Sequence, residues 1–206
     1  RCVVAEGLCE CGAGSVRWCP PRTRERALEA KHEAGQPGRM ESGQGIRLME
    51  VPAQRTGAAG DVHAMGNPHF MVDPIIAKTV AQHIAASFAT VDPSHAAAYQ
   101  ANAKKFEETI NGKLQEWGTK LLPFKGQSLV AYHDSWPYFA HRFGFNINIF
   151  LEPKPGIPPS PSHLAEVIEQ MKAQKIKAII VEPYHNRKIA EKVAQSTGAK
   201  VVDFAQ

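Results

Sequence analysis

The second half of the chain alternates between short apolar runs and segments with helical spacing, and this alternation restricts the possible folds. The apolar runs lie at residues 128–132, 145–151, 177–181 and 200–204. Short apolar runs joined by helices predict parallel strands, because a parallel crossover needs an intervening segment long enough for a helix. We therefore expect residues 122–206 to form an α/β lobe, a parallel sheet with helices on both faces. The pattern stops at Gln206, so we also expect this lobe to be incomplete.

A long amphipathic segment precedes this lobe. Asp92-Pro93 is a typical helix start, with an N-cap residue followed by proline in the first turn. Beyond it, apolar residues recur at spacings of three and four, which predicts one continuous helix over residues 92–121 that connects the flanking parts of the chain. The stripe comprises Tyr99, Ala103, Phe106, Ile110, Leu114, Trp117 and Leu121. We expect it to be buried against both flanking regions.

The first part of the chain has a different character. Residues 1–44 show no sustained helix or strand period, and we expect them to be irregular and separate from the rest of the fold. They include all four cysteines, Cys2, Cys9, Cys11 and Cys19. The spacing of these cysteines fits no common zinc motif, and a disulfide cluster is the alternative. From Gly45 the pattern becomes regular, with a short strand expected at 45–51 and a helix after Asp73-Pro74.

Composition and motifs exclude several classes of function. The formal net charge is only +4, and the basic residues form no dense patch, which argues against a nucleic-acid partner. No apolar run approaches the ~20 residues of a membrane span, and the start at Arg1 shows no signal-peptide pattern. Nucleophile elbows, phosphate loops and dinucleotide glycine fingerprints are absent from the sequence, so we expect no enzyme.

Three residues are candidate metal ligands. His69 lies in a turn just before the helix that follows Asp73-Pro74, where its imidazole can project from a fixed backbone. His133 follows the apolar run 128–132, and ligands of open parallel sheets bind beyond the carboxyl ends of the strands. Asp203 ends the last predicted strand on the same edge. Two imidazoles and a carboxylate are a partial set for zinc or manganese, although a loop histidine and a solvated aspartate are the simpler interpretations.

Other histidines remain open as accessory donors. His63 precedes the turn at Gly66 and could supply a flexible ligand. His185 and Glu182 flank a proline at the end of another strand and form a further candidate pair. Each of these residues has an alternative interpretation as an ordinary loop residue.

Two segments resemble a known family. Residues 66–74 (GNPHFMVDP) resemble the GNPH-aromatic-x-x-DP signature of the zinc and manganese ABC-transporter substrate-binding proteins, and residues 132–139 (YHDSWPYF) resemble that family's His-Asp-x-aromatic-x-Tyr-Phe segment. The IIVEP segment at 179–183 and the long helix also fit. The resemblance covers residues 45–206. It implies two α/β lobes joined by one helix, with residues 45–91 as a remnant of the N-terminal lobe and the metal held in the cleft between the lobes.

The resemblance also implies a ligand set. Its two histidine positions correspond to His69 and His133, and Asp203 lies near the position of the C-terminal ligand. The family's first histidine, expected upstream, has no counterpart, and residues 1–40 do not resemble the family's N-terminal lobe. We therefore expect an N-terminally truncated or frame-shifted member that binds zinc more weakly than an intact relative.

Function follows from the resemblance as an expectation. We expect a periplasmic or cell-surface monomer that binds zinc, or alternatively manganese, and passes it to the permease of an ABC importer. Imidazole ligands favour zinc, because manganese sites favour carboxylate oxygen. A surface adhesin of the same family is the alternative, and an enzyme using His133 and Asp134 is a third hypothesis.

Overall fold

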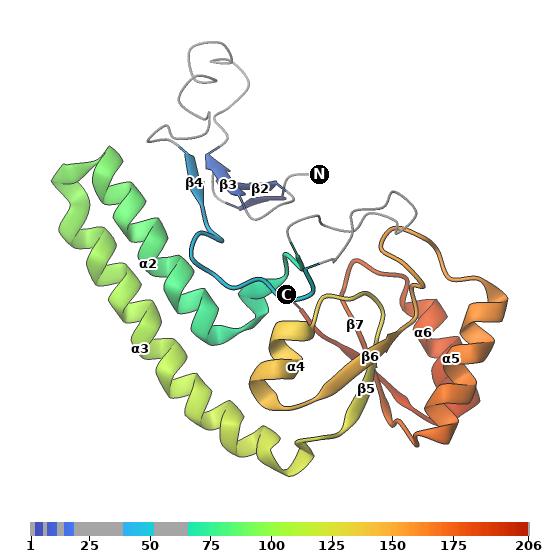
Figure 1. Ribbon diagram of the computed structural model, residues 1–206. Helices are drawn as coiled ribbons and strands as arrows, with labels where there is room; N and C mark the ends of the chain where they lie inside the picture. The colour runs from blue at the N-terminus through green and yellow to red at the C-terminus, as the bar shows by residue number, and fades with distance from the viewer. Residues whose placement is uncertain (1–2, 6–7, 12–14, 19–38, 52–65, 206) are drawn as a thin grey trace. The chain divides into compact units, whose positions relative to one another are not determined.

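The computed structural model describes residues 3–5, 8–11, 15–18, 39–51 and 66–205 (Figure 1). The chain divides into two compact units. The first consists of Arg1–Leu48 and Pro74–Glu116, and the second consists of Met49–Asp73 and Trp117–Gln206. Cys2, Cys19 and the accessory candidate His63 lie outside the described residues.

The second unit contains a four-stranded sheet of order β6-β5-β7-β8 (Figure 1). The strands are β5 (Ser128–Ala131), β6 (Asn146–Phe150), β7 (Ala178–Val181) and β8 (Lys200–Asp203). All three neighbouring pairs are parallel; Val130, for example, is paired with Ile149 on one side and with Ile179 on the other. Each strand coincides with an apolar run of the sequence, so the predicted parallel sheet is confirmed.

Helices cover both faces of this sheet. The helices are α4 (Pro137–Phe143), α5 (Pro161–Ala173) and α6 (Arg187–Thr197). Val130 and Ile179 point to the face that packs on α5 and α6, where Val167, Met171 and Val193 complete a buried cluster. Their chain neighbours Ala131 and Ile180 point to the opposite face and join Trp136 and Phe139. Alternate strand residues thus bury both faces, as the continuous apolar runs require.

Local sequence signals set the ends of these helices. The hydroxyl of Ser160 caps α5 by accepting the backbone N–H of His163 at 3.2 Å. α4 and α6 end at Gly144 and Gly198, which adopt the left-handed conformation at φ of 76° and 71°. Glycine takes this conformation without the strain that a Cβ would add. These defined helix ends let each helix connect one strand to the next in the parallel orientation.

The first unit contains the long helix α2 (Pro74–Val91) and most of α3 (Ala96–Leu121), whose residues from Trp117 onward belong to the second unit. A 3-10 turn, η5 (Pro93–His95), precedes α3, and a second, η6 (Leu122–Phe124), follows it. The continuous helix predicted over residues 92–121 is present as α3 from Ala96 to Leu121, and a 3-10 turn takes the place of its expected first turn. Side-chain hydrogen bonds join α2 and α3, including one of 2.7 Å from Lys78 Nζ to Asn111 Oδ1.

The predicted burial of the α3 stripe is wrong. Among its residues only Ala103 is buried, and Phe106 is 40% exposed. Tyr99 packs edge-on against Phe88 of α2 at 5.4 Å between ring centroids. The α2 sequence is rich in alanine, and a neighbouring helix with short side chains covers only part of a stripe of large ones.

The N-terminal region differs from its prediction as well. Four short strands, β1 (Val3–Ala5), β2 (Leu8–Cys11), β3 (Ser15–Trp18) and β4 (Arg39–Glu41), form an antiparallel sheet in that order. Each strand has three or four residues, too few for a periodic pattern to emerge from the sequence. Cross-strand backbone pairing can order such segments without a long hydrophobic repeat.

The expected strand at 45–51 does not form. The segment 45–91, which we predicted to be one part of the chain, is divided between the two units. Instead the backbone of Met49 bonds within the second unit: its N–H donates to the Tyr138 hydroxyl at 2.8 Å and its carbonyl accepts the Asn67 N–H at 2.8 Å. These bonds assign Met49–Asp73 to the second unit, whereas Pro74 begins the helix of the first. No described helix is both long and apolar enough to cross a membrane.

Candidate metal-binding site

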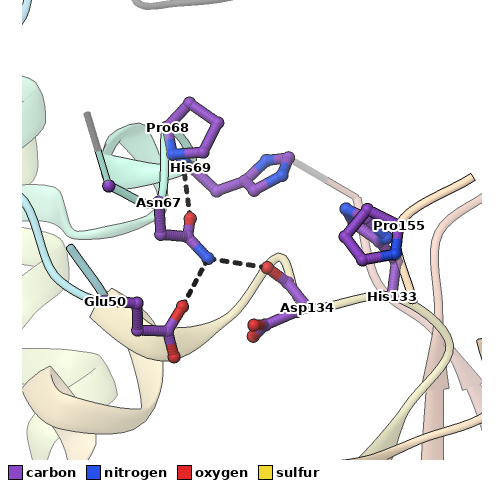
Figure 2. Close-up of a pocket in the computed structure, with 8 residues that line it drawn as sticks. Glu50, Asn67, Pro68, His69, His133, Asp134 and Pro155 are labelled. Carbon is purple, nitrogen blue, oxygen red and sulfur yellow. Dashed lines mark hydrogen bonds between the residues drawn. The ribbon is translucent and has the colours of Figure 1, made fainter. Parts of the chain in front are cut away.

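A pocket of about 180 Å³ opens on the second unit (Figure 2). Two histidines, two carboxylates and a turn form its wall. The lining residues are Glu50, Gly66, Asn67, Pro68, His69, His133, Asp134 and Pro155. Two of the three predicted ligands, His69 and His133, are therefore at one pocket.

The turn before η4 (Phe70–Val72) presents His69. Gly66 adopts φ of 113°, a backbone conformation that is strained for residues with a Cβ atom. The Asn67 side chain accepts a hydrogen bond from the His69 backbone N–H at 3.0 Å. Phe70 is buried and packs edge-on against Tyr138 at 6.4 Å. The backbone on both sides of His69 is thus fixed, and its imidazole extends into the pocket (Figure 2).

The end of β5 presents His133. The preceding Tyr132 is still part of the sheet, with its N–H donating to the Ile180 carbonyl at 3.0 Å. The Ser135 N–H closes a tight turn on the His133 carbonyl at 2.9 Å. The His133 and His69 rings meet edge to face, with centroids 5.4 Å apart and an interplanar angle of 80°. The structure therefore brings these two imidazoles together.

Further ionisable residues surround His133. Glu152, two residues after β6, pairs through its carboxylate with His133 Nδ1. His185, after β7, stacks on Tyr132 at 4.3 Å, and its ring centroid lies 5.8 Å from that of His133. All of these side chains follow neighbouring strands, so the carboxyl edge of the sheet collects them as expected for an α/β fold.

Two carboxylates lie at the other side of the pocket. The Asn67 amide donates to Glu50 Oε2 at 2.8 Å and to the Asp134 carbonyl at 2.9 Å (Figure 2). Burial, the charge of Glu50 and a hydrogen bond to Glu50 raise the pKa of the Asp134 carboxyl to about 7, against its ordinary value of 3.8. The Asp134 carboxyl can therefore be neutral or ionised near neutral pH.

The third predicted ligand, Asp203, is placed differently. It is the last residue of β8, and its carboxylate pairs with the Arg187 guanidinium at the start of α6. Asp203 is not among the pocket-lining residues. The candidate pair Glu182 and His185 does come together, with Glu182 fully buried and 3.7 Å between its Oε2 and His185 Nε2. Burial lowers the pKa of His185.

The donors fit a divalent metal in part. Within the described residues, no three side chains of His, Cys, Asp or Glu are arranged to hold one ion together. Two imidazoles are together, however, and their spacing suits a shared ion. At metal–nitrogen distances of about 2.0–2.1 Å and tetrahedral angles, two ring centres lie roughly 5 Å apart.

The second unit is an α/β fold with imidazoles gathered beyond the carboxyl ends of its parallel strands, the edge at which open α/β sheets bind their ligands. The chain belongs to the family described as ZnuA, zinc-uptake complex component A, periplasmic, whose pattern matches residues 18–205. This match includes residues 18–44, which we predicted to lie outside the family pattern.

Individual relatives agree with this assignment. The high-affinity zinc uptake system protein ZnuA of Brucella abortus is 29% identical over 132 residues, which cover 64% of this chain and 40% of the relative. A crystal structure of ZnuA superposes with a TM-score of 0.68 at 27% identity, covering 87% of this chain and 66% of that one. The laminin-binding protein Lmb of Streptococcus agalactiae gives 0.66 at 29%, covering 80% and 60%. The chain thus spans about 40% of the length of its curated relative.

Proposed function

We propose that this chain binds a divalent transition metal, zinc in preference to manganese, through His69 and His133. The observation that carries the proposal is the edge-to-face approach of these two imidazoles, 5.4 Å apart, in one pocket. Neutral imidazole is a good zinc ligand, whereas manganese sites are richer in carboxylate oxygen. The membership of a zinc-uptake family supports the same choice.

Asp203 is our candidate third donor. It occupies the carboxyl end of β8, the edge on which His133 also lies, and its carboxylate chemistry suits zinc. It would have to leave Arg187 to coordinate an ion, so its contribution depends on the strength of an exposed ion pair. Water molecules can complete the coordination sphere where protein donors are few.

The proposed role is that of a receptor rather than an enzyme, since the family is a transport family. We propose that the protein works in the periplasm or at the cell surface as a monomer and delivers its metal to an ABC importer permease, with no role for nucleic acid. The family description as periplasmic and the zinc-uptake name of the Brucella relative support this role.

A surface adhesin is the second candidate. The observation that favours it is the structural similarity to Lmb, which is described as bifunctional, with adhesin and metal-transporting activity. Binding of the purified chain to immobilised laminin would support this candidate. The two functions are separable if laminin binding persists in variants that no longer bind metal.

The decisive experiment is a zinc titration of the purified chain against a competing chelator. His69→Ala and His133→Ala should each weaken zinc binding by at least about tenfold, equal to about 1.4 kcal/mol. His141→Ala is the matched control, because His141 is an exposed histidine on α4. Tight binding that survives both site replacements would refute the proposal and direct attention to the cysteines of the N-terminal region.

A further inference from the structure

We infer that Glu152 is a positioning residue that holds His133 in its Nδ1–H tautomer and thereby presents Nε2 to the metal. The inference concerns the ring of His133 itself, and its consequence for zinc rests on the proposed function. Glu152 is a positioning residue and not a ligand in this inference, because its carboxylate contacts the His133 imidazole at Nδ1.

The contact between the two side chains is direct and shielded. Glu152 Oε2 pairs with His133 Nδ1, and their side chains are 11% and 19% exposed. Water therefore competes little for either group, which strengthens a charge-assisted hydrogen bond. The two residues follow adjacent parallel strands, β5 and β6, and the Glu152 N–H donates to the Tyr132 carbonyl at 2.9 Å. Both backbones are consequently fixed by the sheet.

The tautomer follows from the chemistry of the partners. An ionised carboxylate only accepts hydrogen bonds, so the nitrogen that it contacts must carry the proton. In a neutral imidazole the other nitrogen then has a free lone pair, which is the form that binds a metal. The Glu152 contact at Nδ1 thus leaves Nε2 of His133 as the coordinating atom, as in other carboxylate–histidine–metal arrangements.

The Glu152 carboxylate is itself held in place. Its second oxygen, Oε1, accepts the Gly156 N–H at 2.8 Å. Gly156 has φ of 78°, a conformation that glycine adopts without strain, and it lies in the tight turn that pairs Lys154 with Ile157. Pro155 of the same turn lines the pocket. One side chain therefore orients both the His133 ring and a part of the pocket wall.

Neighbouring carboxylates do not take this role. Asp134 follows His133 directly, but its carboxyl hydrogen-bonds with Glu50. Glu182 accepts the Trp136 indole N–H at 3.0 Å and faces His185. Each carboxylate near the pocket thus has a separate partner, and Glu152 is the one in contact with His133.

The test begins with the tautomer in the metal-free full chain. Long-range ¹H–¹⁵N NMR of the His133 ring should show the Nδ1–H form at neutral pH. Glu152→Ala should shift the ring towards the Nε2–H form, and Glu152→Gln, whose amide oxygen can still accept from Nδ1, should restore the original form in part. Glu166→Ala, at an exposed glutamate of α5, is the matched control and should change nothing. An Nε2–H ring in the unmodified protein, or an unchanged tautomer in Glu152→Ala, would overturn the inference.

The second readout is zinc affinity. Loss of an orienting partner of a ligand typically weakens metal binding about 10–100-fold, and we expect a loss of this size in Glu152→Ala with a smaller one in Glu152→Gln. Where His133→Ala weakens zinc binding, unchanged affinity in Glu152→Ala would also overturn the inference. His133→Ala separates the two levels: if it leaves zinc binding unchanged, the proposed function fails, whereas the tautomer measurement still decides the role of Glu152.

Discussion

Asp73 and Arg142 form a two-point ion pair that joins the turn carrying His69 to the helix that follows His133. Arg142 Nε donates to Asp73 Oδ1 at 2.9 Å and Nη2 donates to Oδ2 at 2.8 Å. Asp73 is four residues after His69 along the chain, and α4, which bears Arg142, begins four residues after His133. This pair therefore fixes the two segments that carry His69 and His133 against each other.

We expect Arg142→Met to lower the free energy of unfolding by roughly 3 kcal/mol, because it removes the two charge-assisted hydrogen bonds that the guanidinium makes to the buried Asp73 carboxylate. Arg142→Lys should recover only part of the loss, since an ammonium group cannot reproduce the two parallel bonds. Urea denaturation followed by circular dichroism measures both values. Arg187→Met, at an exposed pair, is the control and should cost less than about 1 kcal/mol; equal losses in both variants would contradict this assignment.

The ion pair of Asp203 with Arg187 gives a prediction on the third ligand. If Asp203 coordinates zinc, Arg187→Gln should strengthen zinc binding by up to about fivefold, because an exposed ion pair is worth at most about 1 kcal/mol. Asp203→Asn should weaken it. Isothermal titration calorimetry with both variants decides the matter, and unchanged affinity in both would remove Asp203 from the ligand set.

The start of α3 should make stability depend on pH. Hydrogen bonds from Ser94, Tyr99 and His95 lower the pKa of Asp92 to about 2 from 3.8. A lowered pKa in the folded state means that the ionised carboxylate stabilises the fold above about pH 4 and that this contribution disappears as the pH falls through about 2. Asp92→Asn should therefore melt below the unmodified protein at pH 7, and the difference should shrink between pH 4 and pH 2. A difference in melting temperature that is constant with pH would exclude this cause.

The buried carboxylate of Glu182 depends on Trp136. The indole N–H is a direct donor to Glu182 Oε1 at 3.0 Å, and both side chains are buried. Trp136→Phe should lower the free energy of unfolding by about 2 kcal/mol beyond the loss of ring area, because it leaves an acceptor without its donor. Combining it with Glu182→Met should remove most of that excess. Denaturant titrations of the two single variants and the double variant measure this coupling, and strictly additive losses would argue against it.

The α/β unit could be predicted from the sequence because its signals are local. Apolar runs such as 177–181 mark strands buried on both faces, and Gly144 and Gly198 mark helix ends. The proximity of His69 and His133 followed from the resemblance of residues 66–74 and 132–139 to the two histidine segments of the family, because a turn and a strand end alone show only that a side chain can project. Partial burial of the α3 stripe could not be predicted, because it depends on which residues α2 places opposite it.

The surroundings of the two histidines could not be predicted for a similar reason. The pairing of Glu152 with His133 and the stacking of His185 on Tyr132 join residues that are distant in sequence and belong to different strand ends. The strand order β6-β5-β7-β8 makes them neighbours, and this order is not readable from periodicity. Of these residues, only His185 could be identified from the sequence as a candidate donor, because it lies close to Glu182 in the same strand-end loop. Arg187 was missed as the partner of Asp203 because helix starts and strand ends meet only in the folded sheet.

The Asn67 side chain holds together three parts of the pocket, through His69, Glu50 and Asp134. Asparagine side chains deamidate spontaneously when the backbone nitrogen of the next residue attacks the side-chain amide and ammonia leaves. The next residue here is Pro68, whose nitrogen bears no hydrogen. Asn67 therefore cannot be converted to aspartate by this route. The side chain keeps the amide N–H groups that donate to Glu50 and Asp134.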